Sequence, residues 1–253
     1  MRQDPASLPP TSGAARPSQT TRNVLVSVLT VATGALDVVG ILRLGGVLTS
    51  VMTANMVLLG VSAGKHEASL ALHAVAAFAG YIVGVAVGSR VAGSAPKGQP
   101  TWPRRVSATL GVELGVLAVF ATGWETSGGH PIGATTYWLL VADATASGIQ
   151  SAAVLRLGVS GLSTTYLTGT LTQLVAGLRR GAKRDSNLSV ALLLAVVLGA
   201  ALGSVLATEA PRLMPIVPVG ALLVVLAGAQ LAFPGDRAGI SASRRSAQGS
   251  PQA

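Results

Sequence analysis

The sequence predicts an all-α membrane protein with six transmembrane helices, arranged as an inverted 3+3 repeat with two short re-entrant or broken segments. Half of the 253 residues are hydrophobic and only 11% are charged, whereas soluble domains average about 25% charged residues. The apolar residues form runs of roughly 17 to 25 residues, which suit a hydrocarbon core about 30 Å thick. Two of the apolar segments are short and carry small polar residues at corresponding places in the two halves, which is typical of a transporter-like fold.

Eight apolar segments lie between two polar tails. Residues 1–21 and 234–253 are rich in Pro, Ser and other small polar residues, so we predict disordered cytoplasmic tails. The membrane domain then covers 22–233, with one repeat at about 24–122 and the other at about 134–233. The apolar segments are 24–44, 46–63, 68–92, 106–122, 134–155, 160–178, 188–208 and 214–233.

The second and sixth segments carry the signal for a repeat. The centre of 46–63 reads Thr53-Ala54-Asn55, and 160–178 contains Thr168-Gly169-Thr170. Leu-Arg-Leu-Gly precedes both segments, at 42–45 and at 155–158. The order of these matches predicts that the two halves are equivalent. It also predicts that the two polar turns meet near the middle of the bilayer.

The distribution of Lys and Arg selects six spans over eight. If both short segments enter and return on the same side, 15 of the 18 basic residues fall on the cytoplasmic side with both termini. If all eight segments cross, only 11 do. Because basic residues concentrate in cytoplasmic loops, we expect the six-span topology. Such re-entrant backbone must be buried in protein or line a water-filled cavity.

The composition excludes several function classes. The net charge of +9 does not indicate nucleic-acid binding, because the basic residues lie in short loops between apolar runs. The chain has no cysteine and only three scattered histidines, so we expect no metal and no cofactor. No nucleophile and base pair is visible, and an enzyme is therefore the weakest of the function classes.

Three carboxylic side chains lie at membrane depth, namely Asp37, Glu113 and Asp143. Ionisable groups inside a span cost several kcal/mol and indicate a functional role. No Lys or Arg lies at the same depth, so these groups favour the protonated form. Proton coupling would require a carboxyl group that titrates near neutral pH while a cavity opens to one side. Asp37 is the strongest candidate, because it precedes a short segment. For Glu113 and Asp143, a structural hydrogen bond between helices is the alternative.

Neutral polar side chains in the short segments complete the candidate solute pathway. They offer donors and acceptors for a small polar or anionic solute, and hydrogen bonding between helices is the alternative role. These residues are Thr53, Asn55, Thr168, Thr170 and Gln173.

Glycines spaced four apart form ridges that allow close contact between helices. Gly80, Gly84 and Gly88 form one ridge, and Gly199 and Gly203 form the other. We expect these ridges to pack within the monomer. A homo-oligomer formed through them is the second interpretation.

The chain resembles the YoaK-like family of bacterial integral membrane proteins, whose domain has no known function. The matching pieces cover about 30–233. The family usually has Thr-Gly-Asn where this chain has Thr53-Ala54-Asn55, and Gln-Asn where it has Gln150-Ser151. The resemblance implies six spans and adds Gln150 to the candidate pathway, but implies no substrate. The pieces are Gly34–Asp37, Thr53–Asn55, Glu113, Gly148–Gln150 and Thr168–Gly169.

The sequence therefore predicts a small multi-pass transporter or channel in a bacterial inner membrane. Its partners would be the lipid bilayer and a small polar or anionic solute, which the sequence does not identify, and the path would run between the two repeats. A membrane assembly or regulatory protein that transports nothing is the alternative.

Overall fold

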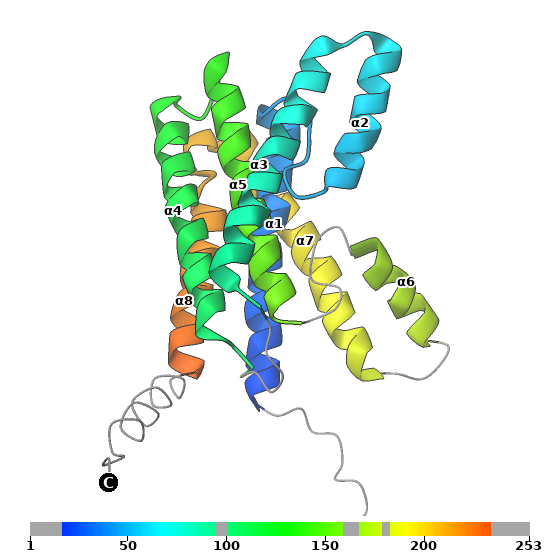
Figure 1. Ribbon diagram of the computed structural model, residues 1–253, viewed down its shortest axis with the longest axis vertical. Coiled ribbons are helices and arrows are strands. Elements are labelled where there is room, and N and C mark those ends of the chain that lie inside the picture. The colour runs from blue at the N-terminus through cyan, green and yellow to red at the C-terminus, as the bar shows by residue number, and fades with distance from the viewer. Residues whose placement is uncertain (1–16, 95–100, 159–166, 179–182, 234–253) are drawn as a thin grey trace, which may run out of the picture.

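The computed structural model describes residues 17–94, 101–158, 167–178 and 183–233, and their regular structure is helical. Six of these helices are long and apolar enough to cross a membrane, which confirms the predicted number of spans (Figure 1). The long helices are α1 (Pro17–Arg43), α3 (Ala68–Ala92), α4 (Arg104–Thr126), α5 (Ala134–Arg156), α7 (Lys183–Glu209) and α8 (Ile216–Ala232), which follows the 3-10 turn η2 (Pro211–Leu213). The short helices are α2 (Met52–Lys65) and α6 (Leu167–Leu178).

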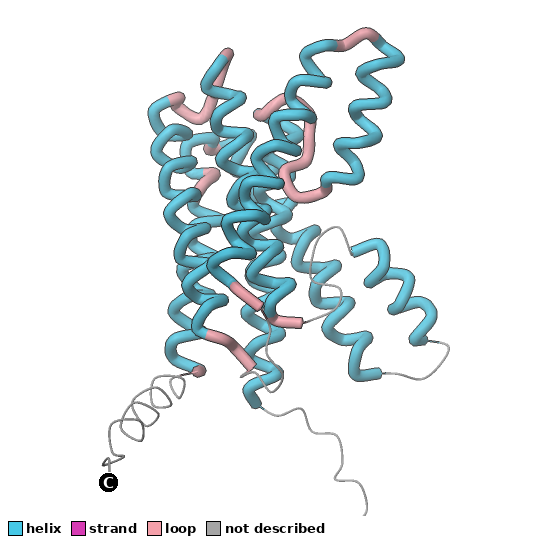
Figure 2. Tube along the Cα trace, viewed as in Figure 1, coloured by secondary structure: helices cyan, strands magenta, loops and turns pink. Residues whose placement is uncertain are grey.

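The chain reverses direction twice around α2. Residues 44–51 run back alongside α1, and α2 then returns to the end of the bundle at which α1 stops (Figure 2). Thr53, Ala54 and Asn55 lie in the first turn of α2, so the reversal precedes them rather than being centred on them. The short helix α6 lies toward the opposite end of the bundle (Figure 1). The segment just before it, 159–166, and most of the predicted tails lie outside the described residues, although α1 begins at Pro17.

Close helix contacts depend on glycine. A Cβ atom on Gly84 of α3 would come within 2.1 Å of the Thr145 carbonyl oxygen on α5, and one on Gly199 of α7 within 2.0 Å of the Val31 carbonyl oxygen on α1. The absence of side chains therefore brings α3 onto α5 and α7 onto α1. Both glycine ridges pack inside the monomer, as predicted.

These contacts recur at a nearly constant distance along the sequence. Gly34 of α1 faces the Val196 carbonyl oxygen, and Gly148 of α5, which lies 114 residues later, faces the Tyr81 carbonyl oxygen. The packing of α4 on α5 and of α2 on α3 is repeated by α8 on α1 and α6 on α7. An internal repeat predicts these correspondences. The inverted relation between the halves stays a prediction.

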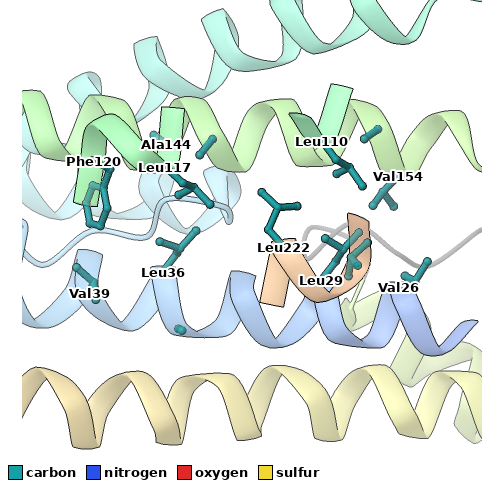
Figure 3. Close-up of a cluster of buried hydrophobic side chains, with 14 of the residues drawn as sticks. Val26, Leu29, Leu36, Val39, Leu110, Leu117, Phe120, Ala144, Val154 and Leu222 are labelled. Carbon is teal, nitrogen blue, oxygen red and sulfur yellow. The ribbon is translucent and has the colours of Figure 1, made fainter. Parts of the chain in front are cut away.

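An apolar cluster holds α1, α4 and α8 together. Leu29 and Leu36 of α1 lie opposite Leu110 and Leu117 of α4, and Leu222 of α8 fills the space between them (Figure 3). All five side chains are almost completely buried. Since lipid is as apolar as these side chains, close packing rather than the hydrophobic effect holds the bundle together.

The basic residues of the described helices form two groups, one at each end of the bundle. Arg43 at the end of α1 lies next to His130 in the α4–α5 loop, with Nη1 of the arginine 3.0 Å from Nδ1 of the histidine. At the opposite end, Nε of Arg156 donates to the carbonyl oxygen of Ala92 over 3.0 Å. The end of α2, which carries Lys65, and the η2 turn, which carries Arg212, lie at the same end of the bundle as the end of α1. The remaining basic residues of the described helices lie at the other end, where α1 begins and α8 finishes.

Candidate functional site

Asp37 fixes the irregular segment 44–51 to α1. Its Oδ1 accepts the backbone N–H groups of Thr49 and Ser50 over 3.0 and 2.9 Å, and the Thr49 hydroxyl lies 3.5 Å away. The Ser50 hydroxyl donates to Oδ2 over 2.5 Å. All three residues are buried. Asp37 thus satisfies backbone groups that no helix satisfies, as irregular backbone at membrane depth requires.

Asn55 fixes the same segment from the other side. Its Oδ1 accepts the N–H of Leu48 over 3.1 Å, and its Nδ2 donates to the Leu48 carbonyl oxygen over 2.6 Å. The side-chain amide therefore pairs with both the backbone N–H and the carbonyl oxygen of Leu48, as the backbone of a neighbouring β-strand would. Asp37 and Asn55 together hold residues 48–50 at a fixed place between α1 and α2.

Two positions near the start of this segment need glycine. Gly45 and Gly46 have φ values of +98° and +79°, a region that L-residues rarely adopt. The His73 ring packs directly on Gly45, where a Cβ atom would lie 2.1 Å from its Cδ2. His73 also stacks on Tyr137 of α5 with ring centroids 4.3 Å apart. The start of the segment thus lies against the His73 ring of α3, although Gly45 and Gly46 are themselves exposed.

Asp143 lies on α5 two turns before Gln150, whose side chain contacts α1. It is completely buried. Neither of its oxygens has a hydrogen-bond partner among the described residues. Asp143, one of the three carboxylic residues predicted at membrane depth, is therefore enclosed within the bundle.

Gln150 joins α5 to α1 about two turns further along. Its Oε1 accepts the Thr33 hydroxyl over 2.9 Å, and its Nε2 donates to the Leu29 carbonyl oxygen over 3.1 Å. Ser147 lies on the same face of α5 between Asp143 and Gln150, and it is buried. We call these five residues the α1–α5 polar stripe: Thr33, Asp37, Asp143, Ser147 and Gln150.

Glu113 lies apart from this stripe, on the apolar face of α4. Leu110, Glu113 and Leu117 are spaced to share one side of the helix, and all three are fully buried. Neither carboxyl oxygen of Glu113 has a hydrogen-bond partner in the described part of the chain. It is therefore the most isolated of the three intramembrane carboxyl groups.

The remaining predicted site residues lie on the short helices. Thr53 and Thr168 are exposed, whereas Thr170 is buried. The side chain of Gln173 lies outside the described residues. Since α2 packs on α3 and α6 on α7, contact between α2 and α6 is at most marginal among the described residues. The structure thus brings Asp37 and Asn55 together but does not add Thr53 or Thr168 to them.

Sequence reasoning could have found part of the stripe. Asp143, Ser147 and Gln150 are four and three residues apart, which places them on one face of a helix. Thr49 and Ser50 gave no such signal, because their role comes from backbone N–H groups in an irregular segment. Across the described ranges, no group of three or more His, Asp or Glu side chains could hold a metal ion.

A lateral groove of about 1030 Å³ lies between the first half of α1 and α7. Its walls are mostly apolar, with polar side chains such as Gln19, Asn23 and Asn187 near one end. None of the described residues that line it is carboxylic. The groove is therefore separate from the α1–α5 polar stripe.

Six apolar spans with lipid-facing side chains such as Val83, Val119 and Leu194 exposed on their surfaces define a multi-pass α-helical membrane protein. The chain belongs to the family described as "Protein of unknown function (DUF1275)", whose model matches residues 25–228. It is 36% identical over 154 residues to the UPF0700 transmembrane protein YoaK of Bacillus subtilis (strain 168). That alignment covers 61% of this chain and 66% of the relative. No solved structure matches the chain.

Proposed function

We propose that the protein is a transporter or channel for a small polar or anionic solute, coupled to protons, in a bacterial cell membrane. The single observation that carries this proposal is the α1–α5 polar stripe. Carboxyl, hydroxyl and amide groups are buried there along the contact of two membrane-spanning helices. Burying such groups is costly, and a bundle that served only as a scaffold could use apolar side chains instead.

The position of the stripe supports a path between the two halves. It joins α1 of the first half to α5 of the second, and these are the helices that correspond under the repeat. In transporters built from repeats, the solute site lies at the repeat interface near the bilayer midplane. The proposed path therefore runs along Thr33, Ser147 and Gln150, next to the segment that Asp37 holds.

The short helix α2 also supports the proposed transport of an anionic solute. The N-terminus of α2 lies part of the way along the bundle and not at its end, directly after residues 48–50. A helix N-terminus carries partial positive charge and free N–H groups, so it favours an anionic group. One end of the bundle carries few basic residues, namely Arg43, Lys65 and Arg212. Because basic residues concentrate on the cytoplasmic side, this distribution supports an orientation with both termini in the cytoplasm.

The test is uptake into proteoliposomes that contain the purified protein, measured for a panel of small polar and anionic solutes with and without a pH gradient. We expect at least one solute to accumulate faster than in protein-free vesicles. Gln150→Ala should slow this uptake, and Asp37→Asn should abolish the gradient-driven part while the protein still folds and inserts. The exposed Thr53→Ala variant serves as the matched control and should transport normally.

Absence of uptake for every solute, with folded wild-type protein in the vesicles, would contradict the transport proposal. Uptake that is equal in wild type and Gln150→Ala would remove the α1–α5 polar stripe from the path. If the rate of uptake is the same with and without a pH gradient, transport is not coupled to protons, and the channel form of the proposal is the one retained.

A further inference from the structure

Two arginines from different halves of the molecule contact the α4–α5 loop, residues 127–133, at the end of the bundle where α1 stops (Figure 1). Arg43 is the last residue of α1, and Arg212 is the middle residue of the η2 turn. Nη1 of Arg43 lies 3.0 Å from Nδ1 of His130 in this loop. We propose that Arg43, His130 and Arg212 form a binding site for a small oxyanion such as phosphate.

Arg212 reaches the loop because two loop positions are glycine. A Cβ atom on Gly128 would lie 3.8 Å from Nη2 of Arg212 and 4.0 Å from its Nε. A Cβ atom on Gly129 would come within 2.7 Å of Cβ of Pro211. The missing side chains thus let the η2 turn pack directly on the loop, with the guanidinium group of Arg212 beside Gly128.

Hydrogen bonds fix both arginines relative to the loop. Trp124 is completely buried at the end of α4, and its Nε1 donates to the carbonyl oxygen of Pro211 over 2.6 Å. On the other side of the loop, Nη2 of Arg43 donates to the carbonyl oxygen of Ala207 near the end of α7. The guanidinium groups are therefore positioned before a ligand arrives, which lowers the entropic cost of binding.

Within the described part of the chain, neither arginine forms an ion pair. The carboxylates on the adjoining helix ends are Glu125 of α4 and Glu209 of α7, and both are exposed. The acceptors of Arg43 are neutral. Because a guanidinium group can only donate, Nδ1 of His130 must accept, and the imidazole carries its proton on Nε2. Two positive charges and an Nε2–H donor thus surround one loop.

This set of groups suits an oxyanion. The planar guanidinium group presents its N–H donors in a fork that matches two oxygens of a phosphate or carboxylate. Arg43 uses one N–H of Nη1 and one of Nη2 for its present partners, and each nitrogen carries a second N–H. Arg212 is exposed and Arg43 is half-buried, so a ligand in water can reach both.

The site goes beyond the proposed path and lies next to it. Residues 37 and 43 are six apart on α1, which is about 9 Å along the helix axis. An oxyanion at the α4–α5 loop would therefore be held close to the end of the α1–α5 polar stripe. Binding at this site does not require transport, so its test is independent of the uptake assay.

The test measures equilibrium binding of radiolabelled inorganic phosphate to the full-length protein in a neutral detergent at low ionic strength. We expect saturable binding. Arg212→Gln should raise the dissociation constant at least about tenfold, because a charge-assisted pair is lost. Arg43→Gln should have an effect of similar size. Because Arg212 is exposed, Arg212→Gln should unfold at the same temperature as wild type, and this variant decides the outcome if Arg43→Gln does not fold.

Lys65→Gln is the matched control. It removes one positive charge from the same end of the bundle, but Nζ of Lys65 lies 3.9 Å from Oε1 of Glu67 in an ion pair. Its affinity for phosphate should equal that of wild type. An equal loss of affinity in Lys65→Gln and Arg212→Gln would attribute binding to the general charge of this end and overturn the inference. Absence of saturable phosphate binding to folded wild-type protein would also overturn it.

A free solute and a lipid headgroup present the same oxyanion chemistry, and nanodiscs of zwitterionic phosphatidylcholine distinguish them. If the site takes a free anion, phosphate should bind in nanodiscs as it does in detergent. If the site takes a headgroup, phosphate binding should be lost in nanodiscs, and Arg212→Gln should retain fewer lipid molecules than wild type in native mass spectrometry. Loss of phosphate binding in nanodiscs with unchanged lipid retention would overturn the inference.

Discussion

Asn55 and Thr53 lie two residues apart on α2, yet only Asn55 is bound to the rest of the protein by its side chain. Asn55 pairs with both backbone groups of Leu48 and is fully buried. Thr53 is exposed. Direct contact with the irregular segment thus distinguishes two residues that belong to the same polar triplet.

We predict that Asn55→Ala destabilises the protein strongly. Leu48, which is partly buried, would lose the partners of its N–H and carbonyl groups, and a buried group left unsatisfied costs about 1 to 3 kcal/mol. The midpoint of thermal unfolding in detergent should fall clearly. Thr53→Ala, on the same turn, should leave it nearly unchanged. An equal fall in both variants would contradict the role given to Asn55.

Glycine contacts set the distance between pairs of helices. A Cβ atom on Gly84 would meet the backbone of α5 at Thr145, whereas one on Gly111 of α4 would meet nothing within 4 Å. The same residue type therefore has different consequences on α3 and on α4. The difference lies in which helix face is in contact, not in the local sequence.

We predict that Gly84→Ala separates α3 from α5 and costs about 1 to 3 kcal/mol, as overpacking does elsewhere. Gly199→Ala should cause a similar loss between α7 and α1. Gly111→Ala should be neutral or slightly stabilising, because alanine favours the helix over glycine. Unfolding followed by intrinsic tryptophan fluorescence would rank the three variants, and tolerance of Gly84→Ala would refute the close contact.

The helix α2 is too short to cross a bilayer. Its 14 residues extend about 21 Å, less than the hydrocarbon thickness of about 30 Å. Its exposed side chains include Met56 and Val57, which suit contact with lipid. The return of the chain to its starting end therefore follows from both the length and the direction of α2.

Because the chain has no cysteine, single cysteines can test this topology. We predict that Lys65→Cys reacts with a membrane-impermeant maleimide from the same side as Ile132→Cys, and that Lys183→Cys reacts only from the other side. Lys65 is the last residue of α2 and Ile132 lies in the α4–α5 loop, and Figure 1 shows the end of α2 and this loop at the same end of the bundle. Labelling of positions 65 and 183 from one side would require eight spans instead of six.

The two halves of the molecule interlock rather than lying side by side. The first helix, α1, packs mainly on α7 and α8, and α3 packs mainly on α5. Trp124 at the end of α4 donates to the Pro211 carbonyl oxygen over 2.6 Å. Each half therefore completes its packing only with the other half.

We predict that a chain cut between residues 128 and 129 assembles only when both fragments are present. Residues 1–128 expressed alone should be degraded, because α1 and α3 lack their main partners. When 129–253 is co-expressed, a tag on either fragment should recover both from detergent extracts. Gly84→Leu in the first fragment should reduce this recovery, whereas Gly111→Leu should not. Stable accumulation of the first fragment by itself would contradict the interlocked packing.

The sequence by itself determined the class of the protein and its six spans, because hydropathy and length are properties of continuous segments. It also identified the glycine ridges and the short segments, whose spacing is local. It placed the reversal at Thr53–Asn55, whereas the chain turns before Met52. The bonds of Asp37 to Thr49 and Ser50, and those of Gln150 to α1, emerged only from the tertiary structure. Those contacts join residues of different helices and an irregular segment, and no periodicity in the sequence records which helix faces meet.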